Sequence, residues 1–221
     1  MKKFTLIDLL ALLICLLPLG YLLYVYPTLP AIVPLHFGAD GKPNGFGTKG
    51  QLFMVQGVLV GVAFLLYLLM KFLPSIDPKK QVKNGEKTFQ KLGLGLTIFL
   101  AALSIIITFA TIDKQFRIDK FMFPLMGLLF VFLGNLMYSI KPNYFAGVRT
   151  PWTLENEDNW RATHRLAGKV WVAGGLIVTV ATLVFPAPVS TFIFIPAILI
   201  MSFIPVIYSY IYFKQHQPKN L

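Results

Sequence analysis

The stretch FMFPLMGLLFVFLGNLMYSI, Phe121–Ile140, decides the fold class of this chain. A helix needs roughly 20 mostly apolar residues to cross about 30 Å of hydrocarbon, and this stretch supplies them. It is followed by the polar, turn-rich segment KPNYFAGVRTPWTL, Lys141–Leu154. Apolar runs that alternate with such polar segments predict a protein that crosses a membrane several times.

Composition extends this interpretation to the whole chain. Its 221 residues are 13% charged, and the mean hydropathy of +0.69 is too high for an ordinary soluble domain. Six apolar runs are candidate membrane helices: Phe4–Tyr26, Leu52–Leu73, Leu94–Ile112, Phe121–Ile140, Val170–Phe185 and Thr191–Phe213. Because a backbone in lipid must satisfy its hydrogen bonds internally, we expect an all-α polytopic membrane helix bundle with six transmembrane helices.

The distribution of charge predicts the orientation of the bundle. Of the 20 Lys and Arg residues, 15 lie before the first run, in segments 71–91 and 141–169, or after Phe213. By the positive-inside rule, these segments and both termini are cytoplasmic, and the protein is a multi-pass protein of the cell membrane. The net charge of +11 then faces anionic lipid headgroups, so membrane lipids are expected partners and nucleic acid is not.

The first run follows Met1-Lys2-Lys3 and could pass for a secretory signal. It is longer than a signal core and no small-x-small cleavage pattern follows it, so we expect a retained helix. The whole chain, 1–221, is therefore predicted to be a single integral membrane domain. Its N-terminal half spans 1–115 with an external Pro/Gly-rich loop at 27–50, and its C-terminal half spans 116–221 with a polar loop at 141–169.

The membrane runs themselves carry few polar groups. Asp8 is the only acid in any run, and it is expected to reach cytoplasmic headgroups or to pair with Lys3. Asn135 is expected to bond a neighbouring helix or to hold the loop that follows. Gly57 and Gly61 lie one turn apart and would let another helix approach closely.

Familiar membrane enzyme chemistry is not indicated. The chain has three His residues, at 36, 164 and 216, and no Glu inside the runs, whereas intramembrane metalloproteases need clustered His and Glu. We therefore predict neither enzymatic activity nor a bound metal or cofactor.

The external loop, Tyr26–Gly50, contains four Pro and five Gly residues and is predicted to form turns and short extended pieces. Asp40-Gly41 and Asn44-Gly45 are the expected turn positions, because these pairs accept positive φ. His36 could be a metal ligand or a pH sensor, but a packed or hydrogen-bonded side chain is the favoured interpretation.

The cytoplasmic loop 141–169 is unusually rich in specific side chains. Pro142 and Asn143 end the fourth span, and Thr150-Pro151 or Thr153 begins a helix whose acids come first and bases later. This amphipathic helix, with Trp160, His164, Ala167 and Trp171 on one face, is expected to lie in the interface before the fifth span. Two interpretations stay open: a topological anchor, or a site at which Arg149 and Arg165 bind a carboxylate or phosphate.

Several motifs resemble the signature of the SdpI family of membrane immunity proteins. They are Gly134-Asn135-Leu136-Met137, Lys141-Pro142-Asn143-Tyr144-Phe145, Gly147 to Leu154, and Trp160-Arg161-x-x-His164-Arg165. In the external loop, Leu29-Pro30, Pro34-Leu35-His36-Phe37 and Gly41-Lys42-Pro43-Asn44-Gly45 resemble a membrane domain of unknown function that forms the N-terminal half of longer family members.

The resemblance implies a function that composition does not. The best-understood member protects its producing cell from a secreted peptide toxin of the sporulation-delaying type. It also holds a small transcriptional repressor at the membrane when toxin is present. By analogy, the external loop would face the toxin with Pro34, His36, Phe37, Asp40 and Asn44.

The cytoplasmic signature site would suit a repressor or a conformational relay. Its residues are Asn135, Asn143, Arg149, Thr150, Pro151, Trp152, Trp160, Arg161, His164 and Arg165. The alternative is a lipid- or peptide-handling membrane transporter or enzyme in which Asn135, Arg149 and His164 bind an anionic headgroup.

Overall fold

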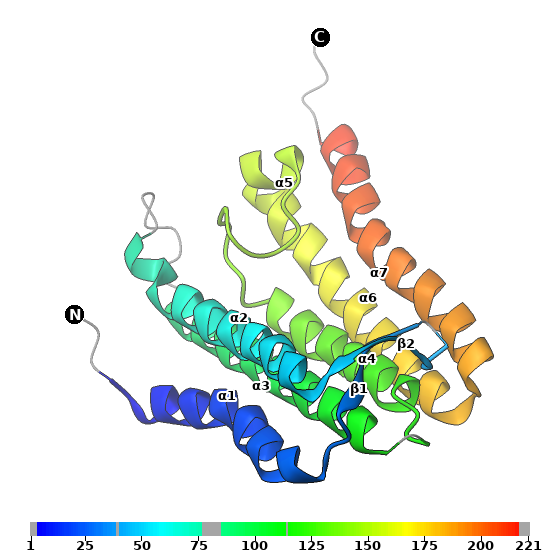
Figure 1. Ribbon diagram of the computed structural model, residues 1–221. Helices are drawn as coiled ribbons and strands as arrows, with labels where there is room; N and C mark the ends of the chain where they lie inside the picture. Colours follow the sequence, from blue (N-terminus) through cyan, green and yellow to red (C-terminus); the bar gives the residue numbers. More distant parts are fainter. Residues whose placement is uncertain (1–3, 39, 77–84, 114, 217–221) are drawn as a thin grey trace.

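The computed structural model describes residues 4–38, 40–76, 85–113 and 115–216. Within these ranges the chain forms seven α-helices and one two-stranded sheet (Figure 1). The helices are α1 (Leu6–Val25), α2 (Lys49–Ile76), α3 (Glu86–Ile112), α4 (Asp119–Met137), α5 (Pro151–Glu155), α6 (Glu157–Val184) and α7 (Ala187–Gln215). All but α5 are long and apolar enough to cross a membrane. The expected six-span helical membrane bundle is therefore confirmed.

The helices pack as two neighbouring groups (Figure 1). Helices α1, α2 and α3 contact one another, α4, α6 and α7 contact one another, and α3 packs on α4 to join the groups. Because successive spans alternate in direction, two ends of the bundle can be defined. The hairpin end holds the described residues of 26–48 and 113–118, with residues 185–186. The signature end holds residues 4–5 and 138–156, the end of α2, the starts of α3 and α6, and the end of α7.

The Pro/Gly-rich loop is a β-hairpin. After a short 3₁₀ turn (η1, Tyr26–Thr28), β1 (Ile32–Phe37) pairs antiparallel with β2 (Pro43–Thr48). The turn expected at Asp40-Gly41 is confirmed, because Gly41 has a φ of 74°. The turn expected at Asn44-Gly45 is wrong, since both residues lie in β2. The turn at Gly41 already reverses the chain, so no second turn is needed. The strand register shifts on both sides of His36, which is the irregularity of a β-bulge.

The hairpin is anchored to the core of the first group through one face. Val33 is fully buried in a cluster with Leu22, Leu29 and Leu52. Adjacent positions alternate between the faces of a strand, so Ile32 and Pro34 lie on the opposite face with their partners Thr48 and Phe46.

The predicted amphipathic helix is not a separate element. Residues 157–169 are the first turns of α6, which continues without a break to Val184. The separate short helix is α5, capped by Thr150 as expected, and Asn156 caps the start of α6. The face bearing Trp160 and His164 is buried against the end of α4 and the loop, so these side chains are inside the protein rather than in the lipid interface.

Close helix packing occurs at other glycines than expected. A Cβ on Gly57 or Gly61 would meet nothing within 4 Å, so no helix of the described chain covers this pair. Instead α4 and α6 approach through glycines seven residues apart on each helix: a Cβ on Gly134 would lie 3.0 Å from the Gly168 carbonyl oxygen, and one on Gly127 would lie 2.7 Å from that of Gly175. Small residues allow two backbones to meet this closely.

Candidate functional site

Asn143 organises the loop between α4 and α5. Its Oδ1 accepts hydrogen bonds from the backbone N–H groups of Phe145 (2.7 Å) and Ala146 (2.8 Å). Its Nδ2 donates to the carbonyls of Lys141 (2.7 Å) and Ala146 (3.1 Å). The side chain is buried and all of these contacts are local, so Asn143 shapes the loop as an Asx turn does.

His164 joins the loop to α6. Its Nδ1 lies 2.9 Å from the Trp160 carbonyl oxygen, and its Nε2 accepts from the Val148 N–H at 3.1 Å. A carbonyl oxygen only accepts, so Nδ1 must carry the proton, and Nε2 must be unprotonated to accept from the Val148 N–H. The ring is therefore the neutral Nδ1–H tautomer. Gly147, at a φ of 110°, packs directly against this ring, which leaves no room for a Cβ. Both ring nitrogens are therefore committed to the fold.

Trp160 is the largest fully buried side chain of the site. Its Nε1 donates to the Ile140 carbonyl at 2.8 Å, and its ring stacks on His164 with 4.0 Å between centroids. Ile140, Val148 and Ala167 complete the surrounding cluster. Trp160 thus holds both ends of the loop against α6.

The start of α5 is tied to α7. Thr150 caps the helix through Thr153, and its hydroxyl lies 3.1 Å from that of Ser209. Asn159 donates to the Ser209 carbonyl at 2.9 Å. Trp152 packs on Tyr210, with 5.0 Å between ring centroids. The signature loop, α6 and α7 are consequently one hydrogen-bonded unit.

The remaining signature residues are exposed. Arg149 donates to the Tyr144 carbonyl at 2.5 Å, and Arg161 forms the expected i,i+4 ion pair with Glu157 at 2.5 Å. Arg165 and Pro151 are also exposed. Asn135 is exposed on α4, so the loop is held by Asn143 and not by Asn135 as proposed from the sequence. Asn135, Arg149 and His164 therefore do not assemble into a common anion site.

The hairpin presents a second candidate surface at the other end of the bundle. Ile32 (58% exposed) and Phe46 (64% exposed) lie on its outer face beside half-buried Pro34. His36 is exposed and its Nδ1 lies 2.5 Å from Asn44 Oδ1, so the hydrogen-bonded interpretation of His36 holds. Asp40 accepts from the Lys42 N–H within the turn, and Phe37 is half-buried.

The tip of this hairpin rests on the start of α4. Gly41 lies against the Asp119 carboxylate, so closely that a Cβ there would come within 2.9 Å of the carboxyl carbon. Arg117 binds the same carboxylate in a bidentate manner, with two N–O distances of 2.9 Å. These hydrogen bonds raise the pKa of Arg117. The hairpin, which leaves the first helix group, is thereby held to the second.

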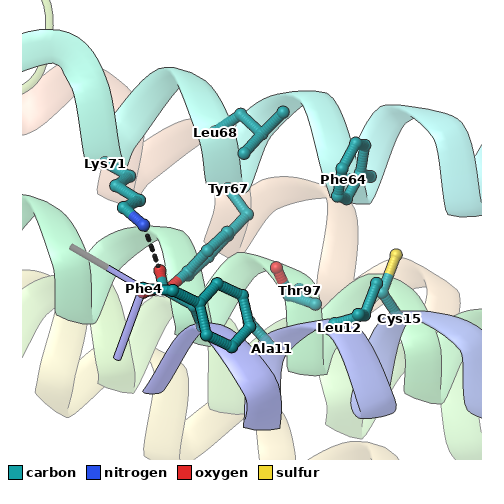
Figure 2. Close-up of a pocket in the computed structure, with 10 residues that line it drawn as sticks. Phe4, Ala11, Leu12, Cys15, Phe64, Tyr67, Leu68, Lys71 and Thr97 are labelled. Atoms are coloured by element: carbon teal, nitrogen blue, oxygen red, sulfur yellow. Dashed lines mark hydrogen bonds and ion pairs between the residues drawn. The ribbon is translucent and has the colours of Figure 1, made fainter. Parts of the chain in front are cut away.

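A third polar cluster lies near the start of α1. The Asp8 carboxylate receives Lys71 Nζ at 2.8 Å and the Tyr67 hydroxyl at 2.7 Å, and it closes a capping box with Thr5. Figure 2 shows Lys71 and Tyr67 reaching down from α2, with the ion pair of Lys71 drawn as a dashed line. These residues line a cavity of about 230 Å³. The cavity walls are otherwise mostly apolar, with Leu12, Cys15, Phe64 and Leu68. The expected partner Lys3 lies outside the described residues.

We expect the Lys71→Met variant to lose about 2 kcal/mol of unfolding free energy, because it leaves the buried Asp8 carboxylate without its cation. The Asp8→Asn/Lys71→Met double variant should recover part of this loss, since no unpaired charge remains. Thermal unfolding of the purified protein in detergent measures both. Additive losses in the double variant would contradict a coupled pair.

Among the described residues, no group of three His, Cys, Asp or Glu side chains could hold a metal ion.

Fold and site together define a six-span helical membrane protein in which many hydrogen bonds hold the polar loop between the fourth and fifth spans. That region matches a known family: the model of the SdpI/YfhL protein family matches residues 139–209, and a domain of unknown function (DUF1648) matches residues 13–60. The chain is also 27% identical over 191 residues to "Immunity protein SdpI" of Bacillus subtilis (strain 168), covering 86% of this chain and 88% of that protein. The resemblance to the SdpI family is thus confirmed. No solved structure matches this chain.

Sequence reasoning missed the partners of several charged residues. The Arg117–Asp119 pair had a signal, because opposite charges two residues apart preceded an apolar run. Lys120 also had a signal at the same boundary, and it donates to the last carbonyls of α6, including Leu183 at 3.2 Å. Lys71 had none, since its partner lies in another helix 63 positions earlier, a pairing that requires knowledge of how α1 and α2 meet.

Proposed function

We propose that this protein is a membrane immunity protein that gives resistance to a secreted antimicrobial peptide of the sporulation-delaying type. The observation that carries the proposal is the similarity to a protein named for immunity over most of both chains. Both candidate surfaces also lie in regions that match family models: residues 13–60 include most of α1 and the hairpin, and residues 139–209 include the signature loop and α6.

We place the hairpin end outside the cell and the signature end, with both termini, in the cytoplasm. The support is the positive-inside rule: Lys71 near the end of α2, Lys87 and Lys91 at the start of α3, and the Lys and Arg residues of 141–169 all lie at the signature end of the bundle. In this orientation the hairpin meets a secreted peptide first. Its outer face offers exposed apolar side chains, Ile32 and Phe46, on a scaffold held by the Gly41–Asp119 contact. Such a rigid apolar patch suits an amphipathic peptide.

The signature end would transmit or report toxin binding. Arg149, Arg161 and Arg165 are exposed there, and they offer a basic surface to a cytoplasmic transcriptional repressor of the kind the family resemblance implies. The hydrogen bonds from Thr150 and Asn159 to Ser209 connect this surface to α7, and α7 returns to the hairpin end. Toxin binding at one end would then alter the other through α6 and α7.

We expect Phe46→Ser to lower the toxin concentration that a sensitive host tolerates by about tenfold. Phe46 is exposed in the free protein and would be buried by the bound toxin, and an aromatic contact buried in this way is worth at least about 1–2 kcal/mol of binding free energy. The matched control is Phe145→Ser, which removes an exposed aromatic residue at the signature end. Survival is measured in a toxin-sensitive Gram-positive host that expresses each variant at an equal membrane level.

Two outcomes would count against the proposal. If the parent protein gives no protection at confirmed membrane expression, the immunity function is wrong for this toxin class. If Phe145→Ser loses as much protection as Phe46→Ser, the hairpin is not the recognition surface.

A further inference from the structure

The signature end contains a pocket that toxin recognition at the hairpin does not use. It has a volume of about 380 Å³ and lies between the end of α4 and the first turns of α6. Tyr138 and Pro142 line one side, Trp160 and His164 line the other, and Lys141 and Arg165 stand at its rim.

The charge of this pocket is strongly positive. Lys141, Arg161 and Arg165 line it together with a single acid, Glu157. Glu157 is already paired with Arg161. Across the described ranges of the chain, no acidic group pairs with Lys141 or Arg165. Two uncompensated cations at one rim favour an anionic ligand.

The floor of the pocket contributes shape rather than hydrogen bonds. Trp160 Nε1 is committed to the Ile140 carbonyl, and both ring nitrogens of His164 are committed to the backbone. The two rings are almost fully buried (1% and 2% exposed) and close the pocket from below, so a ligand meets the exposed Tyr138 ring at the side and the cations at the rim. This combination suits a molecule with an anionic group attached to an apolar body.

The depth of the pocket identifies the source of that molecule. The fourth membrane span ends at Met137, which itself lines the pocket, and Tyr138 follows on an exposed position. Aromatic and basic residues just beyond the end of a span lie at the level of lipid headgroups. A pocket at this depth is within reach of the phosphate of a membrane lipid.

From these observations we infer that the pocket is a binding site for the phosphate of an anionic phospholipid, held between Lys141 and the Arg165 guanidinium over the Trp160–His164 floor. Arg165 can bind two phosphate oxygens in parallel, and Lys141 adds a point charge. The site differs from the anion site suggested by sequence, because Asn135 and Arg149 do not line it and both ring nitrogens of His164 are bonded to the backbone. It does not depend on the proposed immunity function.

The test is lipid binding by the purified full-length protein in neutral detergent. Native mass spectrometry measures binding of dioctanoyl phosphatidylglycerol, with dioctanoyl phosphatidylcholine and inorganic phosphate as separate arms. We expect selective binding of phosphatidylglycerol, and an affinity about tenfold weaker in the Lys141→Gln/Arg165→Gln variant. Higher salt should weaken the parent's binding as well.

The matched control is Lys87→Gln/Lys91→Gln, which removes two exposed cations from α3 without touching the pocket. Equal weakening in both double variants would show nonspecific charge attraction and overturn the site. Equal binding of phosphatidylcholine would overturn the anionic preference, and equally tight binding of inorganic phosphate would overturn the lipid assignment. The Arg165→Lys variant should keep part of the affinity, because it retains the charge without the bidentate geometry.

Discussion

Gly134→Leu is expected to lose about 3 kcal/mol or more of unfolding free energy, because the new side chain has no space between α4 and α6. Its Cβ alone would lie 2.9 Å from the Val172 nitrogen and 3.0 Å from the Gly168 carbonyl oxygen. Both are backbone atoms of α6, so the strain is relieved only if the two helices separate. Separation would also loosen the loop that spans their ends.

Gly57→Leu is the matched control for this variant. It introduces the same side chain into a membrane helix, but a Cβ on Gly57 meets nothing within 4 Å. We expect unchanged or slightly higher stability, since leucine favours a helix more than glycine does. Reversible unfolding by denaturing detergent, followed by circular dichroism, measures both variants. A Gly134→Leu protein as stable as Gly57→Leu would disprove the close α4–α6 contact.

Trp160→Ala should have an effect of similar size, about 4 kcal/mol, because it empties a fully buried aromatic position. The side chain is 1% exposed, and its removal also leaves the Ile140 carbonyl without its donor and His164 without its stacking partner. Trp160→Phe separates these contributions. It keeps most of the ring and removes the N–H, so we expect a loss of only about 1 kcal/mol.

Hydrogen exchange distinguishes a local effect on the loop from a global one. The Val148 N–H is protected by its bond to His164, whose ring stacks on the Trp160 side chain. In Trp160→Ala this amide should exchange faster than amides in α2, since the loop opens before the bundle unfolds. Unchanged protection of Val148 would show that the loop is held without Trp160.

The six membrane spans and their approximate positions follow from the sequence, because lipid forces any long apolar run into a helix whatever it packs against. The turn at Gly41 and the cap at Thr150 are equally local, since each involves residues within a few positions. The signature residues were also recognisable as a set, and so was the basic character of their end of the bundle.

Tertiary structure alone decided which of these residues build the fold and which face outward. Asn143, Trp160 and His164 turn inward because α4 and α6 meet there through Gly134 and Gly168, whereas Arg149 and Arg165 remain outside. The same applies to the pairing of Asp8 with Lys71 and to the uncovered face of Gly57 and Gly61. Hydrophobicity requires that a helix enter the membrane but sets neither its rotation nor its neighbours. Those depend on the fit of side chains from distant parts of the chain.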